Sequence, residues 1–187
     1  MFHNIDVMVI IIVGIAAVLD IKTRRIPNWL TLTVAAAGFI GGFLFLTLQG
    51  DLQGGWQWLL FSGKGWLVGI GIFLIPFILG GMGGGDVKLL GAIGALKGAV
   101  FALETALLGA LWGGLLAIIA ILLKKRPDIL MRFGYGMKLF TTTGGQIGKE
   151  FIIPDENISE KKKIYVPYGL AIFLGVLTVY LVGVAQL

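Results

Sequence analysis

Long runs of apolar residues, separated by short stretches that carry the charges, set the pattern of this sequence. The longest runs approach the roughly 20 residues that cross about 30 Å of hydrocarbon as a helix. We interpret them as six membrane-spanning helices at about residues 5–21, 29–48, 66–81, 87–96, 99–123 and 166–184. The pattern therefore predicts an all-α, polytopic membrane bundle of about six helices that forms a single membrane-embedded domain over residues 1–187.

The boundary between the fourth and fifth predicted spans rests on length. Residues 87–123 contain only Lys88, Lys97 and Glu104 as charged residues, so hydropathy alone would allow one continuous helix. At about 1.5 Å of rise per residue, such a helix would extend far beyond the bilayer. We therefore place a break at Lys97 and Gly98.

Basic residues concentrate in the first and last connections between the predicted spans. Lys and Arg near span ends favour the cytoplasmic side of a membrane. Six spans place both connections on that side, with the two termini and residues 49–65 on the opposite side. The residues concerned are Lys22, Arg24 and Arg25 in the first connection, and Lys124, Lys125, Arg126, Arg132, Lys138, Lys149, Lys161, Lys162 and Lys163 in the last, at about residues 124–163.

The composition excludes several classes of protein. Apolar residues make up 57% of the chain and charged residues 13%, which is not the composition of a soluble domain. There is no cysteine, so disulfides, thiolate zinc sites and cysteine nucleophiles are excluded. His3 is the single histidine, and we expect no metal or other cofactor. The net charge of +5 comes from basic residues beside apolar runs, which indicates contact with anionic lipid and no nucleic-acid partner.

Glycine is the second abundant feature, with 30 residues in the chain. Several fall inside predicted spans at a spacing of four, which lets neighbouring helices approach closely. We predict close helix packing at these positions, which are Gly38 with Gly42, Gly94 with Gly98, and Gly109 with Gly113.

Two acidic residues stand at the edges of apolar runs. Asp20 ends the first run, and Asp86 follows three glycines at the start of the fourth. An ionised acid in hydrocarbon costs roughly 2.5 to 3.5 kcal/mol. The six-span topology brings both acids to the same depth at the cytoplasmic boundary. Two facing carboxylates share a proton, so that one can activate a water while the other donates to a carbonyl, as in aspartic proteases. The alternative is that each acid forms an interfacial ion pair, Asp20 with Lys22, Arg24 or Arg25 and Asp86 with Lys88.

Residues around the two acids are candidates for supporting or substrate-contacting roles. Gly83 and Gly85 let the backbone approach another helix or an extended substrate. Pro27 and Asn28 are expected to stop the first helix and to cap the second. Lys88 either tunes the Asp86 carboxylate or extends to the lipid headgroups. Tyr168 opens the last span and is a candidate for substrate contact.

Three motifs in this order resemble the type IV prepilin peptidases, which are membrane aspartic proteases of the Gly-x-Gly-Asp kind. The motifs are Asp-Ile-Lys-Thr-Arg-Arg-Ile-Pro-Asn at 20–28, Gly-Gly-Gly-Asp-Val-Lys-Leu-Leu at 83–90 and Val-Pro-Tyr-Gly at 166–169. The resemblance implies a single peptidase domain with Asp20 and Asp86 as the catalytic pair. It also implies cleavage of short basic leader peptides from type IV pilus or secretion-system precursors at the cytoplasmic face of the inner membrane.

The sequence departs from the larger members of that family. It has neither an N-terminal cytoplasmic extension nor paired Cys-x-x-Cys motifs, and it is similar to the short forms that serve tight-adherence (Flp) pili. Methyltransferase activity is therefore not expected. The partners implied are a prepilin or pseudopilin precursor and membrane lipid, and the sequence leaves open whether the chain forms a homo-oligomer.

Two other functions compete with this interpretation. In a proton-coupled small transporter the two acids would form a relay, but apart from Glu104 the sequence offers no further acid at another depth. A noncatalytic assembly subunit of a pilus or secretion system would leave both acids unexplained.

Overall fold

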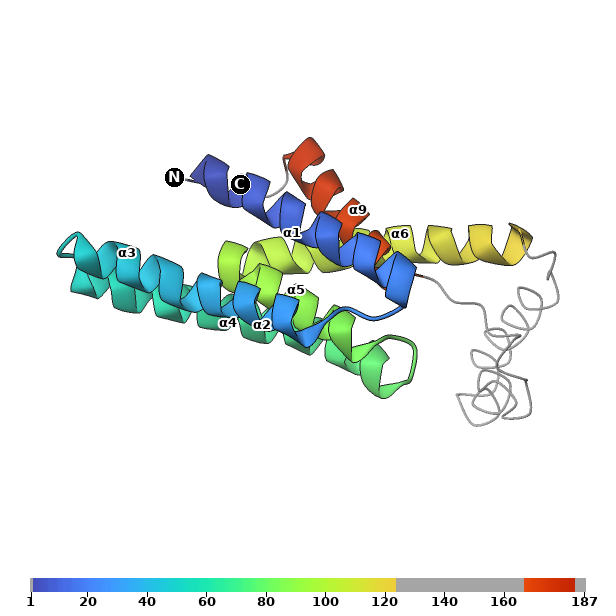
Figure 1. Cartoon of the computed structure of the whole chain (residues 1–187), viewed down its shortest axis with the longest axis horizontal. Helices are drawn as coiled ribbons and strands as arrows, with labels where there is room; N and C mark the ends of the chain where they lie inside the picture. Colours follow the sequence, from blue (N-terminus) through green and yellow to red (C-terminus); the bar gives the residue numbers. More distant parts are fainter. Residues whose placement is uncertain (1, 124–166, 184–187) are drawn as a thin grey trace, which may run out of the picture. The chain divides into compact units, whose positions relative to one another are not determined.

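The structure, a computed structural model, describes residues 2–123 and 167–183, and these residues form helices joined by short connections (Figure 1). They contain no strand, so the all-α prediction is confirmed for this part of the chain. The chain divides into two compact units, Met1–Gly113 with Pro167–Leu187, and Gly114–Val166. The predicted cytoplasmic connection at 124–163 lies outside the described residues.

Among the residues that the structure describes, three helical segments are long and apolar enough to cross a membrane, namely Asn28–Leu48, Leu52–Ile78 and Ala99–Leu123. The number of crossings and the side of each terminus remain predictions. The elements are α1 (Phe2–Thr23), α2 (Asn28–Ala36), the π-helical turn η1 (Ala37–Gly41), α3 (Gly42–Leu48), α4 (Leu52–Ile78), α5 (Gly84–Lys97), α6 (Ala99–Leu123) and α9 (Tyr168–Val182).

Helix α4 begins earlier than the sequence analysis predicts. Residues 49–65 were expected to separate two spans, yet α4 is continuous from Leu52 to Ile78 and, with 27 residues, is about 40 Å long. The Asp51 side chain caps it by accepting a hydrogen bond from the Gly54 N–H at 2.7 Å. Gln53, Gln57 and Lys64 make this segment polar, but Gln and Lys are good helix formers, so polarity does not interrupt the helix.

Helix α5 lies at the centre of the first unit. It has 14 residues, so at about 21 Å it is shorter than the hydrocarbon core. From Asp86 to Leu96 every residue except Lys88 is buried. It packs against α1, α2, α4 and α9, so its surroundings are mainly protein.

Small residues allow both α4 and η1 to approach α5 at backbone contact distance. A Cβ at Gly65 would lie 2.6 Å from the Gly94 carbonyl carbon, and a Cβ at Gly38 would lie 2.9 Å from that of Ala95. The close packing predicted at Gly38 and Gly94 is therefore confirmed. Gly98 has a φ of 87°, a left-handed value that favours glycine, and it separates α5 from α6. The predicted break at Lys97 and Gly98 is confirmed as well.

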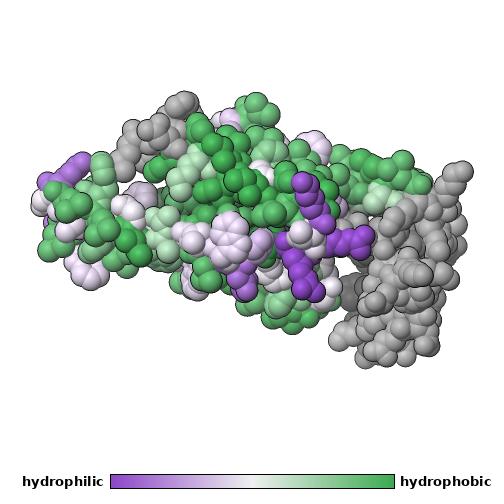
Figure 2. Space-filling view, in the orientation of Figure 1, coloured by the Kyte–Doolittle hydropathy of each residue, from purple (hydrophilic) through white to green (hydrophobic). Residues whose placement is uncertain are grey.

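The exterior of the first unit is mainly apolar. Ile11, Leu32 and Leu67 are among many large apolar side chains that are more than half exposed. Figure 2 shows this apolar surface interrupted by hydrophilic residues near the C-terminal end of α1, where Lys22, Arg24 and Arg25 are exposed. An exterior of this kind is typical of a protein surrounded by lipid, with a charged border at one end.

Candidate active site

Asp20 lies in the last turn of α1 and faces α9. Its side chain is only 4% exposed. The Gly169 backbone N–H, in the first turn of α9, donates a hydrogen bond of 2.8 Å to Asp20 Oδ2. Apolar residues of α1 and α9 hold the two helices together, including Val13 and Ile172, both fully buried. Packing of these two helices therefore places the Asp20 carboxylate against the start of α9.

The connection after Asp20 differs from the prediction at Pro27 and Asn28. Helix α1 ends at Thr23, and the chain then turns at Arg24, which has a left-handed φ of 55°. Pro27 occupies the cap position of α2 with a φ of −65°, and Asn28 is the first residue of that helix. The expectation that Pro27 stops the first helix and Asn28 caps the second is therefore wrong. Proline fits this cap position because its φ agrees with the extended backbone there and its missing N–H would have had no partner within the helix.

Asp86 is the third residue of α5 and the second buried acid. Its Oδ2 accepts a hydrogen bond of 3.2 Å from the Gly83 N–H, and the side chain is 7% exposed. The buried Oδ1 has no hydrogen-bond partner among the described residues. Asp86 precedes the predicted span 87–96. Its pKa is raised from 3.8 to about 7, mainly by burial and secondly by the charge of Asp20, while the hydrogen bond from the Gly83 N–H acts in the lowering direction.

Gly83 and Gly85 shape the entry to α5. Gly83 supplies the N–H that holds Asp86. A Cβ at Gly85 would lie 3.0 Å from Ile26 Cβ, so glycine lets the start of α5 pack tightly on the connection between α1 and α2. This contact joins the two segments that carry the acids.

Lys88 lies on the exposed side of α5, and its two predicted roles, tuning the Asp86 carboxylate or extending to the lipid headgroups, stay predictions. Its Nζ donates a hydrogen bond of 2.9 Å to Asn28 Oδ1, and both residues are exposed. Lys88 therefore links α5 to the start of α2, next to the close contact between Gly85 and Ile26.

Tyr168 opens α9 and is half-buried. Its ring lies against α6, since a Cβ at Gly113 would be 3.3 Å from the Tyr168 Cε1. It also lies close enough to Asp86 for the charge on that carboxylate to act on the phenol. A contact with a bound substrate stays a prediction.

The three sequence motifs thus meet at one place, where α1 ends and α5 and α9 begin. Asp20 and Asp86 interact electrostatically although they are far apart in the sequence. Gly169 belongs to the third motif, but the sequence predicts no role for it. In the structure its N–H is the donor to Asp20. The signal that could have identified it is a glycine two residues after a proline at the start of a helix, where backbone N–H groups have no partner within the helix.

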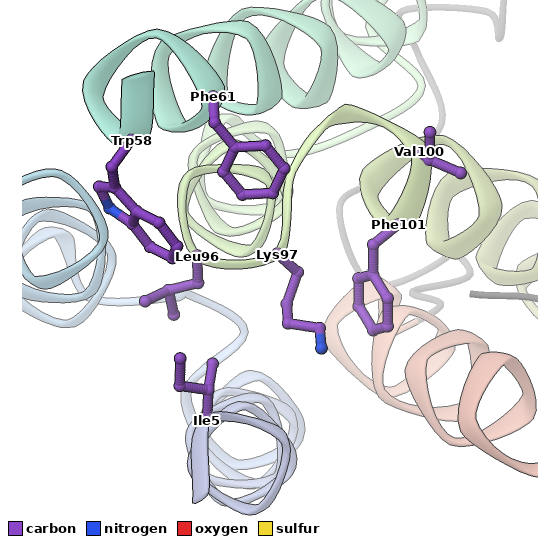
Figure 3. A pocket seen from close by; sticks show the side chains of 7 residues that line it. All are labelled: Ile5, Trp58, Phe61, Leu96, Lys97, Val100 and Phe101. Carbon is purple, nitrogen blue, oxygen red and sulfur yellow. The ribbon is translucent and has the colours of Figure 1, made fainter. Parts of the chain in front are cut away.

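A second polar cluster lies at the opposite ends of the same helices. Lys97 forms an ion pair with Asp6, and the Tyr180 hydroxyl donates a hydrogen bond of 3.1 Å to Asp6 Oδ1. A pocket of about 240 Å³ adjoins this cluster, and Figure 3 shows Lys97 and Phe101 side by side in its wall. The other residues that line it are Ile5, Trp58, Phe61, Leu96 and Val100. Its cation is already paired, so this pocket offers little chemistry.

Neither cluster has the donors of a metal site. Within residues 2–123 and 167–183, no group of three or more His, Cys, Asp or Glu side chains could hold a metal ion. The Asp20 and Asp86 carboxylates can carry out acid–base chemistry, since the buried Asp86 Oδ1 has no partner among the described residues and can bind a proton or a water.

Comparison with known proteins shows the family to which this chain belongs. The chain matches the type IV leader peptidase family over residues 7–122, a stretch that includes both Asp20 and Asp86. Together with the membrane-capable helices, this match makes the chain a membrane protein of the leader-peptidase type. It belongs to the type IV leader peptidase family, and the family resemblance drawn from the three motifs is confirmed. Searches of curated proteins and of solved structures found no match.

Proposed function

We propose that this protein is an aspartic endopeptidase that removes short basic leader peptides from type IV prepilins or prepilin-like precursors. The observation that carries the proposal is the pair of buried carboxylates, one from the end of α1 and one from the start of α5. The charge of one raises the pKa of the other. In a chain of the leader peptidase family, such a pair is the natural candidate for the catalytic centre.

The chemistry follows from the sharing of one proton between the two acids. Two neighbouring carboxylates in a buried site do not both ionise readily, so near neutral pH the pair holds a single proton. The ionised member can take a proton from a water, and the neutral member can donate its proton to the carbonyl oxygen of the scissile peptide. The unpartnered Asp86 Oδ1 supports this interpretation because it is a buried polar atom that a water or a substrate group would satisfy.

The cytoplasmic face of the inner membrane is the side on which we propose cleavage. Lys22, Arg24 and Arg25 are exposed directly after Asp20, and positive charge at span ends favours the cytoplasmic side. A leader peptide that carries basic residues is also cytoplasmic before its precursor is exported. The site and the proposed substrate would then meet on one side of the membrane, with both termini of the enzyme on the other.

Cleavage by purified protein tests the proposal. The protein in lipid vesicles is incubated with a prepilin that carries a short basic leader, and the products are measured by mass spectrometry. We expect one cut at the leader boundary in the wild type and none in Asp20→Asn or Asp86→Asn. Proton-coupled uptake of a solute without cleavage would instead favour the transporter interpretation and contradict the proposal.

A further inference from the structure

The two carboxylates of the proposed pair are held differently, and the difference suggests separate roles. We infer that Gly169 is a positioning residue whose backbone N–H keeps Asp20 ionised as the general base, which leaves Asp86 as the proton-carrying general acid. This inference rests on the proposed function and goes beyond it, because the proposal alone leaves the roles of the two acids interchangeable.

The geometry at Asp20 favours a negative charge there. Gly169 is the second residue of α9, so its N–H is one of the first-turn donors that have no partner within the helix. It points at Asp20 Oδ2 over 2.8 Å in a buried setting. Backbone donors at a helix start stabilise anions, both through the hydrogen bond and through the helix dipole.

Position 169 also has no room for a side chain. A Cβ there would lie 2.9 Å from Asp20 Cβ, closer than a real Cβ comes to another atom, and a tight 3.1 Å from Oδ2. Only glycine lets the N–H reach the carboxylate without displacing Asp20. The glycine at this position is therefore explained by the donor that it presents to Asp20.

The geometry at Asp86 favours a proton instead. Asp86 also lies in the first turn of its helix, so the helix dipole by itself does not distinguish the two acids. Its bond to the Gly83 N–H is longer, at 3.2 Å, and Oδ1 has no partner among the described residues. The charged group that acts on Asp86 is Asp20 on α1, another acid, and the Tyr168 phenol on α9 lies near enough to Asp86 to feel its charge. A pKa of about 7 for Asp86 agrees with a proton that stays in place at lower pH.

The roles fix the path of each proton during hydrolysis. Asp20 takes a proton from a water as the water oxygen bonds to the scissile carbonyl carbon, and Asp86 gives its proton to the carbonyl oxygen. In the resulting diol, Asp20 returns its proton to the amide nitrogen as the carbon–nitrogen bond breaks. One diol hydroxyl passes its proton to Asp86, so both residues regain their starting states, with a free carboxyl and a free amine as products.

An amide-to-ester substitution at Gly169 tests the assignment directly. Incorporation of glycolic acid at this position replaces the N–H by an oxygen and adds no volume. We expect the acidic limb of the pH profile of kcat to move upward by about one pH unit, the size expected for loss of one hydrogen bond to a charged group. The alkaline limb, which reports Asp86, should remain near its wild-type position.

The matched control is the same substitution at Leu170. Its N–H donates to the Pro167 carbonyl over 3.2 Å within α9, so the ester removes a hydrogen bond of the same helix turn without touching Asp20. The control should keep the wild-type pH profile. An acidic limb that stays in place in the Gly169 ester, or that moves equally in the Leu170 ester, would overturn the inference.

A measurement on the unaltered chain covers the case in which the ester protein fails to fold. Labelling tyrosine with ¹³C at the carbonyl and glycine with ¹⁵N selects the Tyr168–Gly169 and Tyr135–Gly136 amides in an NMR spectrum. The chemical shift of the Gly169 amide proton should change as the pH is lowered into the acidic range. In Asp20→Asn this change should be lost. A Gly169 response that appears only near pH 7 and is abolished in Asp20→Asn would assign the roles the other way round.

The proposed function and the inference about Gly169 can fail separately. If the wild type cleaves and both Asn variants do not, the proposed function holds and the ester result judges the Gly169 inference alone. If the wild type cleaves nothing at any pH, the proposed function fails, and the NMR titration still decides which carboxylate is ionised.

Discussion

The two polar clusters of the first unit are built from the same three helices, α1, α5 and α9. They differ in the partners that surround their carboxylates. At one end, Asp6 Oδ1 accepts from both the Lys97 amine and the Tyr180 hydroxyl. At the other end, Asp86 has a neighbouring acid, and one of its oxygens has no partner within the described residues. A buried acid that is paired stabilises helix packing, whereas a buried acid that faces another acid has a raised pKa and can move protons.

The largest effect should come from removing either acid of the unpaired cluster. Asp20→Asn and Asp86→Asn should each lower kcat by about 10³-fold or more, because general acid–base groups contribute about 10² to 10⁴ each and these two act together. The double variant should be no worse than either single one. Cleavage kinetics with a prepilin substrate measure this.

The control comes from the other end of the same helix. Asp6→Asn should cleave at close to the wild-type rate per folded molecule, since Asp6 lies away from the proposed centre. A loss of cleavage in Asp6→Asn as large as that in Asp20→Asn, in well-folded protein, would remove the distinction between the clusters.

The second prediction concerns stability against pH. The pKa of Asp86 is about 7 in the folded protein against an ordinary value of 3.8, so the folded state holds a proton that the unfolded chain releases in between. The stability gained from this proton is fully present below pH 3.8 and is lost as the pH rises through about 7. Asp86→Asn should therefore unfold at a higher temperature than wild type at about pH 8, with the difference shrinking toward about pH 5.

Thermal unfolding in detergent across this pH range provides the measurement. A constant difference between wild type and Asp86→Asn at all pH values would show that the Asp86 carboxyl is ionised throughout and would contradict the shared proton. Asp51→Asn, at the exposed cap of α4, is the comparison variant and should show no such dependence.

The third prediction concerns the paired cluster. Lys97→Met leaves Asp6 without its cation and should lower the free energy of unfolding by about 1 to 3 kcal/mol, because breaking a partly buried pair leaves a charge uncompensated. Lys97 and Asp6 are 18% and 27% exposed, which places the effect below that of a fully buried pair. The double variant Asp6→Asn with Lys97→Met should recover part of the loss. A double variant as unstable as the sum of the single ones would mean that the pair does not interact.

The smallest effect is expected at the exposed link between Lys88 and Asn28. Lys88→Met should change the free energy of unfolding by at most about 1 kcal/mol, since an exposed hydrogen bond of this kind contributes little. Because the link ties α5 to the start of α2, we expect a several-fold change in KM or kcat, far smaller than that of Asp86→Asn. An activity loss equal to that of Asp86→Asn would give Lys88 a direct role in the chemistry.

Much of this molecule could be predicted from the sequence because its main signals are local. Apolar runs identify the helices, and the break at Gly98 follows from helix length. The glycine pairs predict close packing, which the structure has at Gly38 and Gly94. The two acids could be selected because a carboxylate beside hydrocarbon needs compensation.

What the sequence could not give depends on contacts between distant segments. Helix α4 begins at Leu52 because Asp51 caps it and because its polar residues are compatible with a helix. Hydropathy alone does not detect a helix start of this kind. Two hydrogen bonds join residues from separate elements, one from Lys88 to Asn28 and one from the Gly169 N–H to Asp20. The periodicity of the sequence cannot predict such contacts. That Asp6 is paired while Asp86 is not could likewise be learned only from the packed helices.

The most direct test of the central claim is an infrared titration of the protonated carboxyl band in lipid. We predict that wild type at about pH 6 contains one protonated carboxyl that is absent in Asp86→Asn and that loses its proton near pH 7. In Asp20→Asn the same carboxyl should lose its proton at lower pH, because the neighbouring charge is gone. Absence of this band at about pH 6, or a titration that Asp20→Asn leaves unchanged, would contradict the claim that Asp20 and Asp86 act as a pair.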